Sequence, residues 1–371
     1  MHKLNQKKIQ NAEARVEAVM KHRVKIPLLI AVAFFFITLT PLPSTAAQFS
    51  ELFVFGDSLS DTGNVFNASK TATGTGTPPP PYFQGRFSNG LVWVDYLAKR
   101  LNLNPVPVTT LKSNIPPSEG INFAFGGATI SGNSSSNASV PGLQQQVAEF
   151  QDLVTNQSAD RTALFIFWIG ANDYLPTLDQ ATSSPDPEVA IQQIMTAVRS
   201  LYERGARHFL VANLPDLSET PLALQRGASA SARLKTLSDR HNALLKTKLD
   251  ALQRSLPEIH VAQLDVNEIF QEALADKFSF THFNAPCYER STGSICTQPD
   301  QYLFWDAIHP TTAAHRQISE AALKVLGDNT AAQTVVPAKA GLFLVGTFSV
   351  LVGAGLWRQQ TLLRKRRRSR L

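Results

Sequence analysis

The feature that most constrains the fold of this chain is an alternation, beyond residue 48, of short apolar runs with longer stretches of helical periodicity. A parallel sheet requires such an alternation, because a helix usually carries the chain back between neighbouring parallel strands. The run 163–169 is continuously apolar and aromatic, which is typical of a strand buried on both faces. We therefore expect one α/β domain, a three-layer α/β/α sandwich with about five parallel strands.

The expected elements can be placed along the sequence. Strands are predicted at residues 51–55, 121–125, 163–169, 208–212 and 259–264. Helices are predicted at residues 91–101, 143–154, 187–204, 229–255 and 311–326. Two stretches, 67–81 and 131–139, are rich in Thr, Gly and Pro or in Ser and Asn, and are predicted to be loops.

The chain carries a formal net charge of +6, and the distribution of that charge decides what it means. Residues 1–47 hold seven Lys and Arg against two Glu, and residues 335–371 hold eight Lys and Arg with no acid. The ends therefore carry +5 and +8, which leaves −7 on residues 48–334. A domain of that sign lacks the basic surface that binds a phosphate backbone, so we expect no nucleic-acid partner.

Residues 1–47 are predicted to be a secretory signal peptide. An apolar stretch, 28–39, follows three basic residues and precedes the small-residue run 44–47, which has the form of a cleavage site. The basic leader would have ordinary length if translation began at Met20, which we take as a hypothesis. We expect residues 48–329 to form the exported domain, periplasmic or extracellular; the alternative is an uncleaved N-terminal anchor.

The last segment, 330–371, is predicted to contain a linker, a membrane segment and a basic tail. Residues 341–357 are apolar and, at roughly 17 residues, just long enough to cross a bilayer. Basic residues such as those of 364–370 stay on the cytoplasmic side, which would leave the domain outside. This end resembles the PEP-CTERM sorting signals of exopolysaccharide-producing bacteria, although 337–339 read Pro-Ala-Lys instead of Pro-Glu-Pro. A permanent anchor and a transient sorting signal both remain open.

The chain has two cysteines, Cys287 and Cys296, both in the part expected to be exported. A disulfide between them would close a short loop and contribute roughly 2.5–3 kcal/mol in the chain-entropy model. Free thiols are the alternative. Two cysteines cannot build a zinc cage, and no metal, nucleotide or flavin motif occurs, so we expect neither metal nor cofactor.

The first expected strand ends in Gly56-Asp57-Ser58-Leu59. A serine just past a strand end lies at the carboxyl edge of the sheet, where open α/β folds place their sites. Gly56 lets the turn tighten, and the backbone N–H of Ser58 can face an oxyanion. Taken alone, however, these four residues are better explained as a turn with a helix cap.

Near the end of the expected domain, Asp306 precedes His309 by three residues. An imidazole can act as a general base when a carboxylate fixes its tautomer, and this spacing allows the contact within one turn of chain. The plainer alternative is a capping Asp beside a surface His.

Two further motifs end expected strands. Gly127 belongs to a glycine pair where a backbone N–H can approach a ligand closely, and Asn172 follows the buried run 163–169. With the N–H of Ser58, the Gly127 N–H and the Asn172 amide supply the convergent donors that an oxyanion hole needs. Asp57 and Asp173 could contact substrate, but holding their turns is the plainer role. The other histidines considered, expected in surface or packing roles, are His208, His241, His282 and His315.

Four motifs of this chain resemble, in their order, the conserved blocks of the GDSL (SGNH) lipase/esterase family. They are Gly-Asp-Ser-Leu, the Gly-Gly turn, Gly-Ala-Asn-Asp and Asp-Ala-Ile-His-Pro, and the resemblance covers about residues 50–327. The resemblance implies a flavodoxin-like α/β/α fold. It also implies that Ser58 is the nucleophile, His309 the base and Asp306 its orienting partner. Ser58, Gly127 and Asn172 would be the three oxyanion donors.

We therefore expect hydrolysis of carboxylic esters outside the cytoplasm, with a small-molecule, lipid or acylated-carbohydrate ester as substrate. Two alternatives remain. One is a deacetylase of O-acetylated polysaccharide with the same fold, and the other is a catalytically silent, surface-anchored binding protein. A membrane contact through the C-terminal segment is expected in each case.

Overall fold

The computed structural model describes residues 49–112, 117–130, 132, 140–154, 158–178, 185–275 and 278–334. A six-stranded, fully parallel sheet forms the centre of this part of the chain, in the order β2-β3-β1-β4-β5-β6. The strands are β1 (Leu52–Gly56), β2 (Val106–Pro107), β3 (Gly120–Asn122), β4 (Leu164–Trp168), β5 (His208–Ala212) and β6 (His260–Leu264).

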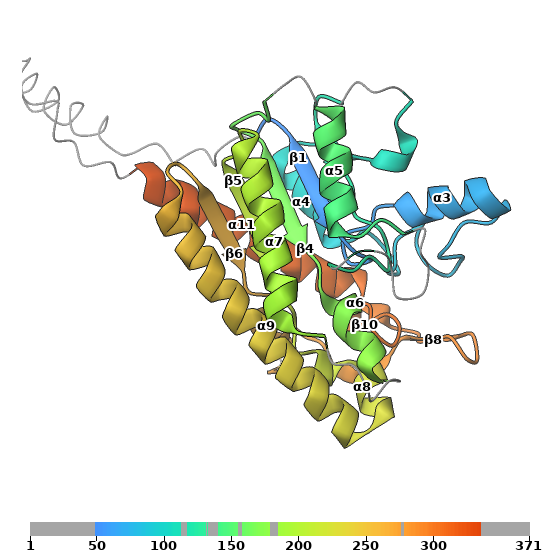
Figure 1. Cartoon of the computed structure of the whole chain (residues 1–371). Coiled ribbons are helices and arrows are strands. Elements are labelled where there is room, and N and C mark those ends of the chain that lie inside the picture. Colours follow the sequence, from blue (N-terminus) through green and yellow to red (C-terminus); the bar gives the residue numbers. More distant parts are fainter. Residues whose placement is uncertain are drawn as a thin grey trace, which may run out of the picture. The chain divides into compact units, whose positions relative to one another are not determined.

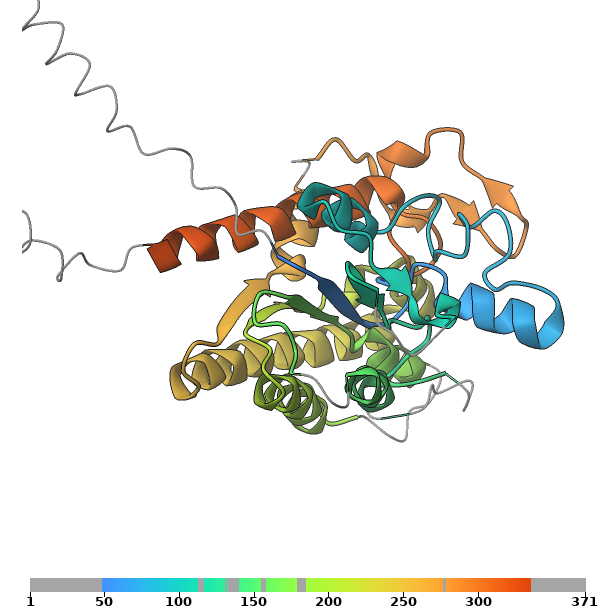
Figure 2. The same cartoon turned by 90° about the horizontal axis from the view of Figure 1, so that it is seen from above.

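Helices cover both faces of the sheet, which confirms the predicted three-layer α/β/α sandwich (Figures 1 and 2). One face is covered by α5 (Leu143–Leu153), α7 (Pro187–Glu203) and α9 (Ala228–Ser255). The other is covered by α4 (Trp93–Leu101), α10 (Val266–Leu274) and α11 (Thr312–Thr334). Shorter helices lie around the carboxyl edge: α3 (Asn64–Thr73), α6 (Ala171–Tyr174) and α8 (Pro221–Arg226).

Alternate residues of the central strands point to opposite faces of the sheet, so each strand contributes side chains to both hydrophobic cores. In β1, Phe53 and Phe55 pack toward α5, α7 and α9, whereas Leu52 and Val54 pack toward α4 and α11. All five residues of β1 and of β4 are buried, because helices lie on both sides. This is why the strands appear as continuous apolar runs in the sequence.

Two small sheets extend the carboxyl edge. β7 (His282–Pro286) pairs in parallel with β10 (Tyr302–Phe304), and β8 (Tyr288–Glu289) pairs with β9 (Ser294–Ile295) as a hairpin. A disulfide joins Cys287 to Cys296 at the base of this hairpin. The hairpin therefore has a covalent closure next to β10, the strand that leads to Asp306.

All five predicted strands are present, and β2 adds a sixth, which is only two residues long and too short to show a period. One prediction about an element is wrong. The predicted loop 67–81 begins as the helix α3. The buried Asp61 carboxylate accepts hydrogen bonds from the first N–H groups of that helix, at 2.6 Å from Asn64 N and 3.2 Å from Val65 N.

Some predicted segments lie outside the described residues. These are the signal peptide 1–47, the membrane segment 341–357 and, apart from Gly132, the loop 131–139. Among the helices in the described part, none combines the length and the apolar character needed to cross a membrane.

The strand order places a topological switch point at β1. From β1 the chain goes to the edge strand β2 and returns to β3 beside β1, and it then crosses to β4 on the other side of β1. In open α/β sheets, the crevice beyond the carboxyl ends of such strands is where ligands bind. The residues that follow β1, β3 and β4 therefore meet at one edge.

Candidate active site

Ser58 lies on the turn that follows β1. The Gln146 side chain, on α5, fixes the last residue of the strand: it accepts from Gly56 N–H and donates to Gly56 O, each at 2.9 Å. Asp57 Oδ1 accepts from Leu59 N–H at 3.0 Å, which closes the turn around Ser58. A side chain could not replace the hydrogen of Gly56, since its Cβ would lie 2.5 Å from the Trp168 carbonyl oxygen.

Residues 306–309 form a tight turn after β10, which we call the Asp-His turn. Asp306 Oδ1 accepts from the backbone N–H groups of Ile308, at 2.9 Å, and His309, at 2.8 Å. The imidazole of the same His309 lies with Nδ1 2.8 Å from Asp306 Oδ2 and 3.0 Å from Oδ1. The carboxylate is thus held by local hydrogen bonds and faces the ring it was predicted to reach.

The structure joins this turn to Ser58. His309 Nε2 lies 2.8 Å from Ser58 Oγ, across 251 residues of sequence. A carboxylate can only accept, so Nδ1 carries the proton and Nε2 is free to accept the hydroxyl hydrogen. Ser58 and His309 are each 8% exposed and Asp306 is 2% exposed. The three side chains form one buried, continuous hydrogen-bonded chain.

Burial and hydrogen bonding act in opposite directions on Asp306. Burial tends to raise the pKa of this carboxyl, but the electrostatic interaction and hydrogen bond with the neighbouring His309, which favour the ionised form, outweigh it. Hydrogen bonds from the Tyr82 hydroxyl and the Ile308 N–H add to the effect, so the pKa of Asp306 falls below its usual range. The carboxyl is therefore ionised in the folded protein near neutral pH.

The glycine pair after β3 presents two different N–H groups. Gly126 N–H donates to Asp61 Oδ2 at 2.9 Å. Among the described residues, no acceptor meets the N–H groups of Gly127 or Ser58. Gly127 has φ +83°, a left-handed conformation that glycine adopts readily. The geometry leaves Gly127, and not Gly126, with a donor to offer.

Asn172 lies in the first turn of α6, directly after β4. Its Nδ2 donates to the Ala128 carbonyl at 2.9 Å, which uses one of the two amide hydrogens and fixes the side chain. Asn172 lines the same pocket as Ser58 and His309, whereas Gly127 is not part of that lining. A second amide hydrogen of Asn172 is therefore available beside the serine.

The pocket beside Ser58 has largely apolar walls. Besides the residues above, Asp57, Asp216 and Thr220 contribute polar atoms. The apolar lining consists of Leu59, Trp168, Ala171, Leu175, Pro215, Leu217, Phe270, Phe304, Ile308 and Pro310. Such a lining can accommodate an apolar portion of a ligand while the polar groups orient its reacting centre.

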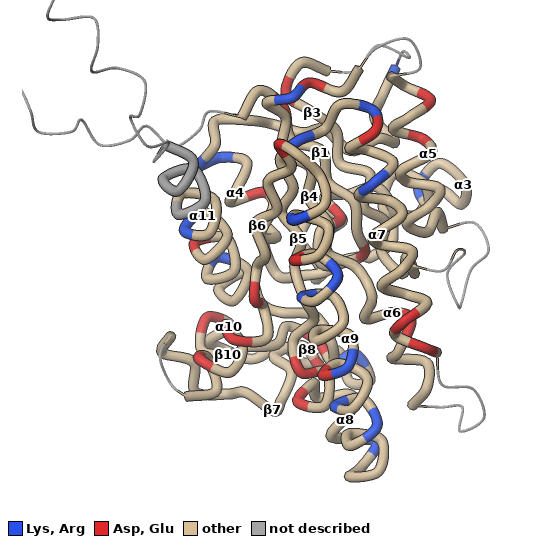
Figure 3. The backbone as a smooth tube through the Cα atoms, turned by 60° about the vertical axis from the view of Figure 1, so that its left-hand side comes forward, with Lys and Arg blue, Asp and Glu red and all other residues tan. Residues whose placement is uncertain are grey.

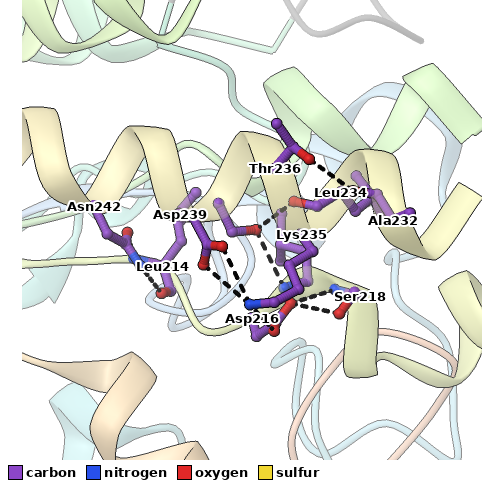
Figure 4. A network of polar contacts seen from close by, with 11 residues as sticks. Leu214, Asp216, Ser218, Ala232, Leu234, Lys235, Thr236, Asp239 and Asn242 are labelled. Atoms are coloured by element: carbon purple, nitrogen blue, oxygen red, sulfur yellow. Dashed lines mark hydrogen bonds and ion pairs between the residues drawn. The ribbon is translucent and has the colours of Figure 1, made fainter.

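One wall of the pocket is fastened to α9 (Figure 4). Asn242 makes two hydrogen bonds to the backbone of Leu214, accepting from its N–H at 3.0 Å and donating to its O at 2.8 Å. Lys235 Nζ lies 3.2 Å from Asp216 Oδ2. Asp216 Oδ1 also accepts from the hydroxyl of Ser218 at 2.6 Å. The segment 214–220, which we call the pocket wall, is thereby held by side chains of one long helix.

The remaining titratable candidates lie elsewhere or hold structure. His241 is fully buried, its Nδ1 lies 2.9 Å from the Tyr174 hydroxyl, and burial lowers its pKa to about 3. His315 is buried in α11, and burial with the nearby charge of His309 lowers its pKa to about 3. Asp173 Oδ2 accepts from Ile130 N–H at 2.9 Å. His208 is partly buried, and His282 is exposed.

Three residues of the site escaped the sequence analysis. Gln146 could have been noticed, because it is a polar residue on the buried face of an otherwise apolar helix surface. Asp61 binds the start of α3 and the glycine turn together, which needs contacts between distant segments. Tyr82, whose hydroxyl lies 2.5 Å from Asp306 Oδ2, follows a proline run that carries no signal for such a role.

Comparison with known families then decides the classification. The model of the family described as GDSL-like Lipase/Acylhydrolase matches residues 52–322. The chain belongs to the GDSL family. Its members that match over most of this chain include GDSL esterases/lipases, so the chain is a serine ester hydrolase.

Individual GDSL relatives are distant. The chain is 30% identical to a GDSL esterase/lipase of Arabidopsis thaliana, over 76% of this chain and 83% of that protein. It is 28% identical to an inactive GDSL esterase/lipase-like protein of the same plant, over 77% of this chain and 74% of that protein. A solved acetyl-xylooligosaccharide esterase from Geobacillus stearothermophilus is 16% identical, with a TM-score of 0.44 over 76% of this chain and 97% of that one.

Proposed function

We propose that this GDSL hydrolase cleaves carboxylic esters with Ser58 as nucleophile, His309 as general base and acid, and Asp306 as the group that orients and stabilises the imidazolium. The observation that supports this most directly is the continuous chain from Ser58 Oγ to His309 Nε2 and from His309 Nδ1 to Asp306 Oδ2, each step 2.8 Å. A serine is activated when a base within hydrogen-bond reach is itself held by a third group.

The proposed reaction has two halves. Ser58 Oγ bonds to the acyl carbon as His309 Nε2 takes the hydroxyl proton; the carbon–oxygen bond to the alcohol then breaks, and the alcohol leaves with that proton. In the second half, water attacks the acyl-enzyme while His309 removes its proton. The carbon–Oγ bond breaks, Ser58 regains a proton from His309, and the carboxylic acid is released.

We further propose that the tetrahedral anion is stabilised by the N–H groups of Ser58 and Gly127 and by the Asn172 amide. The absence of other acceptors for these N–H groups in the described structure supports the assignment, as does the fixed amide of Asn172. Donors that are oriented before the reaction favour the transition state without reorganising during it.

The alternative of a catalytically silent protein is weakened by the complete set of residues. The apolar pocket lining favours acyl esters over a bare sugar acetate.

The test is hydrolysis of p-nitrophenyl esters from acetate to palmitate by the full chain, by Ser58→Ala and by the matched variant Ser291→Ala at an exposed position. We expect activity in the wild type and in Ser291→Ala, and its loss in Ser58→Ala. Folded protein that is inactive on every ester, but that releases acetate from O-acetylated polysaccharide, would establish the deacetylase. Inactivity on both would favour the silent binding protein.

We also propose that the hydrolase is exported through residues 1–47 and contacts the membrane through residues 341–357. The apolar stretches and their basic flanks support this proposal. Cell fractionation with N- and C-terminal sequencing of the mature protein tests it. Recovery of the intact chain from the cytoplasm would contradict it.

A further inference from the structure

The segment 82–91 lies along the Asp-His turn and contacts it at several points. The Phe87 ring lies 5.2 Å from the His309 ring, centroid to centroid. Ser88 Oγ donates to the Pro310 carbonyl at 2.9 Å. This segment belongs neither to β10 nor to the turn itself, so it is an independent support for the residues that face Ser58.

The closest of these contacts reaches the carboxylate. Tyr82 Oη donates to Asp306 Oδ2 at 2.5 Å. The other donors to Asp306 are the N–H groups of Ile308 and His309 and the imidazole of His309, all within the Asp-His turn. Among the described residues, Tyr82 is thus the one donor that ties the carboxylate to another part of the domain.

The Tyr82 ring is held in a buried aromatic cluster next to the disulfide. It is 8% exposed and meets the rings of Tyr288 and Trp305 edge to face, at 5.7 and 6.3 Å. Cys287 N–H donates to Phe304 O at 3.0 Å, and Tyr288 N–H donates to Trp305 O at 2.6 Å. The disulfide loop therefore packs beside both the tyrosine and the residues that lead into Asp306.

We propose that Tyr82 is a positioning residue of the catalytic site, which holds the Asp306 carboxylate in the orientation that its partner imidazole requires. This inference rests on the proposed function of Ser58, His309 and Asp306. A carboxylate that shares Oδ2 between a fixed phenol and the imidazole cannot rotate away from the ring without losing both bonds. The phenol thereby limits the carboxylate to the productive geometry.

The electrostatics agree with this geometry. Burial, together with the negative charge of Asp306 and the hydrogen bond to it, raises the pKa of Tyr82 above its ordinary value. The phenol therefore stays protonated, and remains a donor, over the pH range in which a serine hydrolase works. A hydrogen bond to a charged, buried acceptor is stronger than one between neutral groups.

The experiment compares the full-length wild type with Tyr82→Phe, which removes one oxygen and keeps the ring. We expect kcat on a soluble p-nitrophenyl ester to fall at least about 10-fold, with KM changed less than about 2-fold, as the loss of a hydrogen bond to a charged group implies. kcat is expressed per Ser58 labelled by a fluorophosphonate probe, so unfolded protein does not contribute.

Two further variants separate positioning from packing. Tyr288→Phe removes a hydroxyl from the same cluster with no contact to Asp306, and should retain wild-type kcat. In an Asp306→Asn background, Tyr82→Phe should change kcat less than about 2-fold, because the two residues act together. If the wild type is active and Tyr82→Phe has the same kcat, this inference is overturned while the proposed function stands. The same holds if Tyr82→Phe still lowers kcat 10-fold in the Asp306→Asn background. An inactive wild type would instead overturn the proposed function.

Discussion

Two buried carboxyls flank the reacting atoms, and burial has opposite outcomes for them. Asp306 meets the His309 imidazole and several other donors, so its pKa falls. Asp57 is 1% exposed and accepts from the Leu59 N–H, which does not compensate for desolvation, so burial raises its pKa to about 7. Adjacent carboxyls at one site can therefore differ in charge near neutral pH.

Asp57 should make stability depend on pH. Its pKa in the folded state lies above the ordinary value of 3.8, so its contribution to stability is fully present below about pH 4 and is lost as pH rises through about 7. The unfolding free energy of the wild type should fall as pH rises from 5 to 8. In Asp57→Asn, which has no carboxyl to ionise, we expect this fall to be smaller by roughly 1–3 kcal/mol. Urea unfolding at both pH values measures this, and parallel losses in the two proteins would contradict it.

Asn172 should act on turnover. Replacing it with Ala removes one of the proposed oxyanion donors, and we expect kcat to fall about 10²–10³-fold with little change in KM. Steady-state kinetics on a p-nitrophenyl ester measure the effect, with the exposed Asn104→Ala as the control. An unchanged kcat in Asn172→Ala would remove the residue from the oxyanion hole.

At the scale of elements, a 28-residue helix forms the support of the pocket wall. α9 packs on the sheet through its carboxyl-terminal half, with Leu245, Leu249 and Leu252 in the core. Its amino-terminal half extends past the carboxyl edge and carries Lys235, and Asn242 lies at the middle of the helix (Figures 1 and 4). One continuous helix therefore packs on the sheet at one end and holds the pocket wall in place at the other.

Asn242→Ala should loosen that wall. The substitution leaves both backbone groups of Leu214 without their partners, and we expect unfolding free energy to fall by about 1–3 kcal/mol. We also expect KM to rise several-fold, because the pocket wall loses its fixed position. Denaturation and steady-state kinetics measure these effects, with the exposed Thr236→Ala on the same helix as the control. Equal KM values in Asn242→Ala and Thr236→Ala would show that the hydrogen bonds of Asn242 do not shape the pocket.

At the scale of the whole molecule, charge and chain direction separate the domain from its ends. Lys and Arg are interspersed with Asp and Glu along the described backbone and form no single basic stripe (Figure 3). α11 begins just after the Asp-His turn and runs back along the sheet for 23 residues, about 34 Å at 1.5 Å per residue. It ends near the edge where β1 begins, opposite the site (Figure 1).

Residues 48–334 should therefore carry the catalysis alone. Every residue assigned to the site lies between positions 56 and 310, and both ends of the described chain are at the opposite edge of the sheet. We expect kcat/KM of this fragment to match the full chain within about 2-fold on a soluble ester. Titrated active sites give the comparison, and a loss beyond 10-fold per site would show that a terminal segment takes part.

The sequence by itself determined the features that depend on residues close together in the chain: the buried strands, the Asp-His turn and the helices with one apolar face. The burial of β4 on both faces required its continuous apolar run, and the three-residue separation of Asp306 and His309 suffices to close their turn. Ser58 and Asn172 each follow a parallel strand, which places both at the carboxyl edge of the sheet. The strand ends and the family resemblance therefore predicted the same site for these two residues. The helical stretches were found because each buries one periodic face.

The tertiary structure alone decided the contacts that cross the sequence. Ser58 and His309 meet over 251 residues, and only the strand order sets that distance. α3 was missed because Asp61, which caps it, is oriented by the glycine turn of another crossover. Tyr82 reaches Asp306 over 224 residues from a proline-rich segment without periodicity. Periodicity reports which face of an element is buried, whereas the partner of a polar side chain depends on packing that no single segment contains.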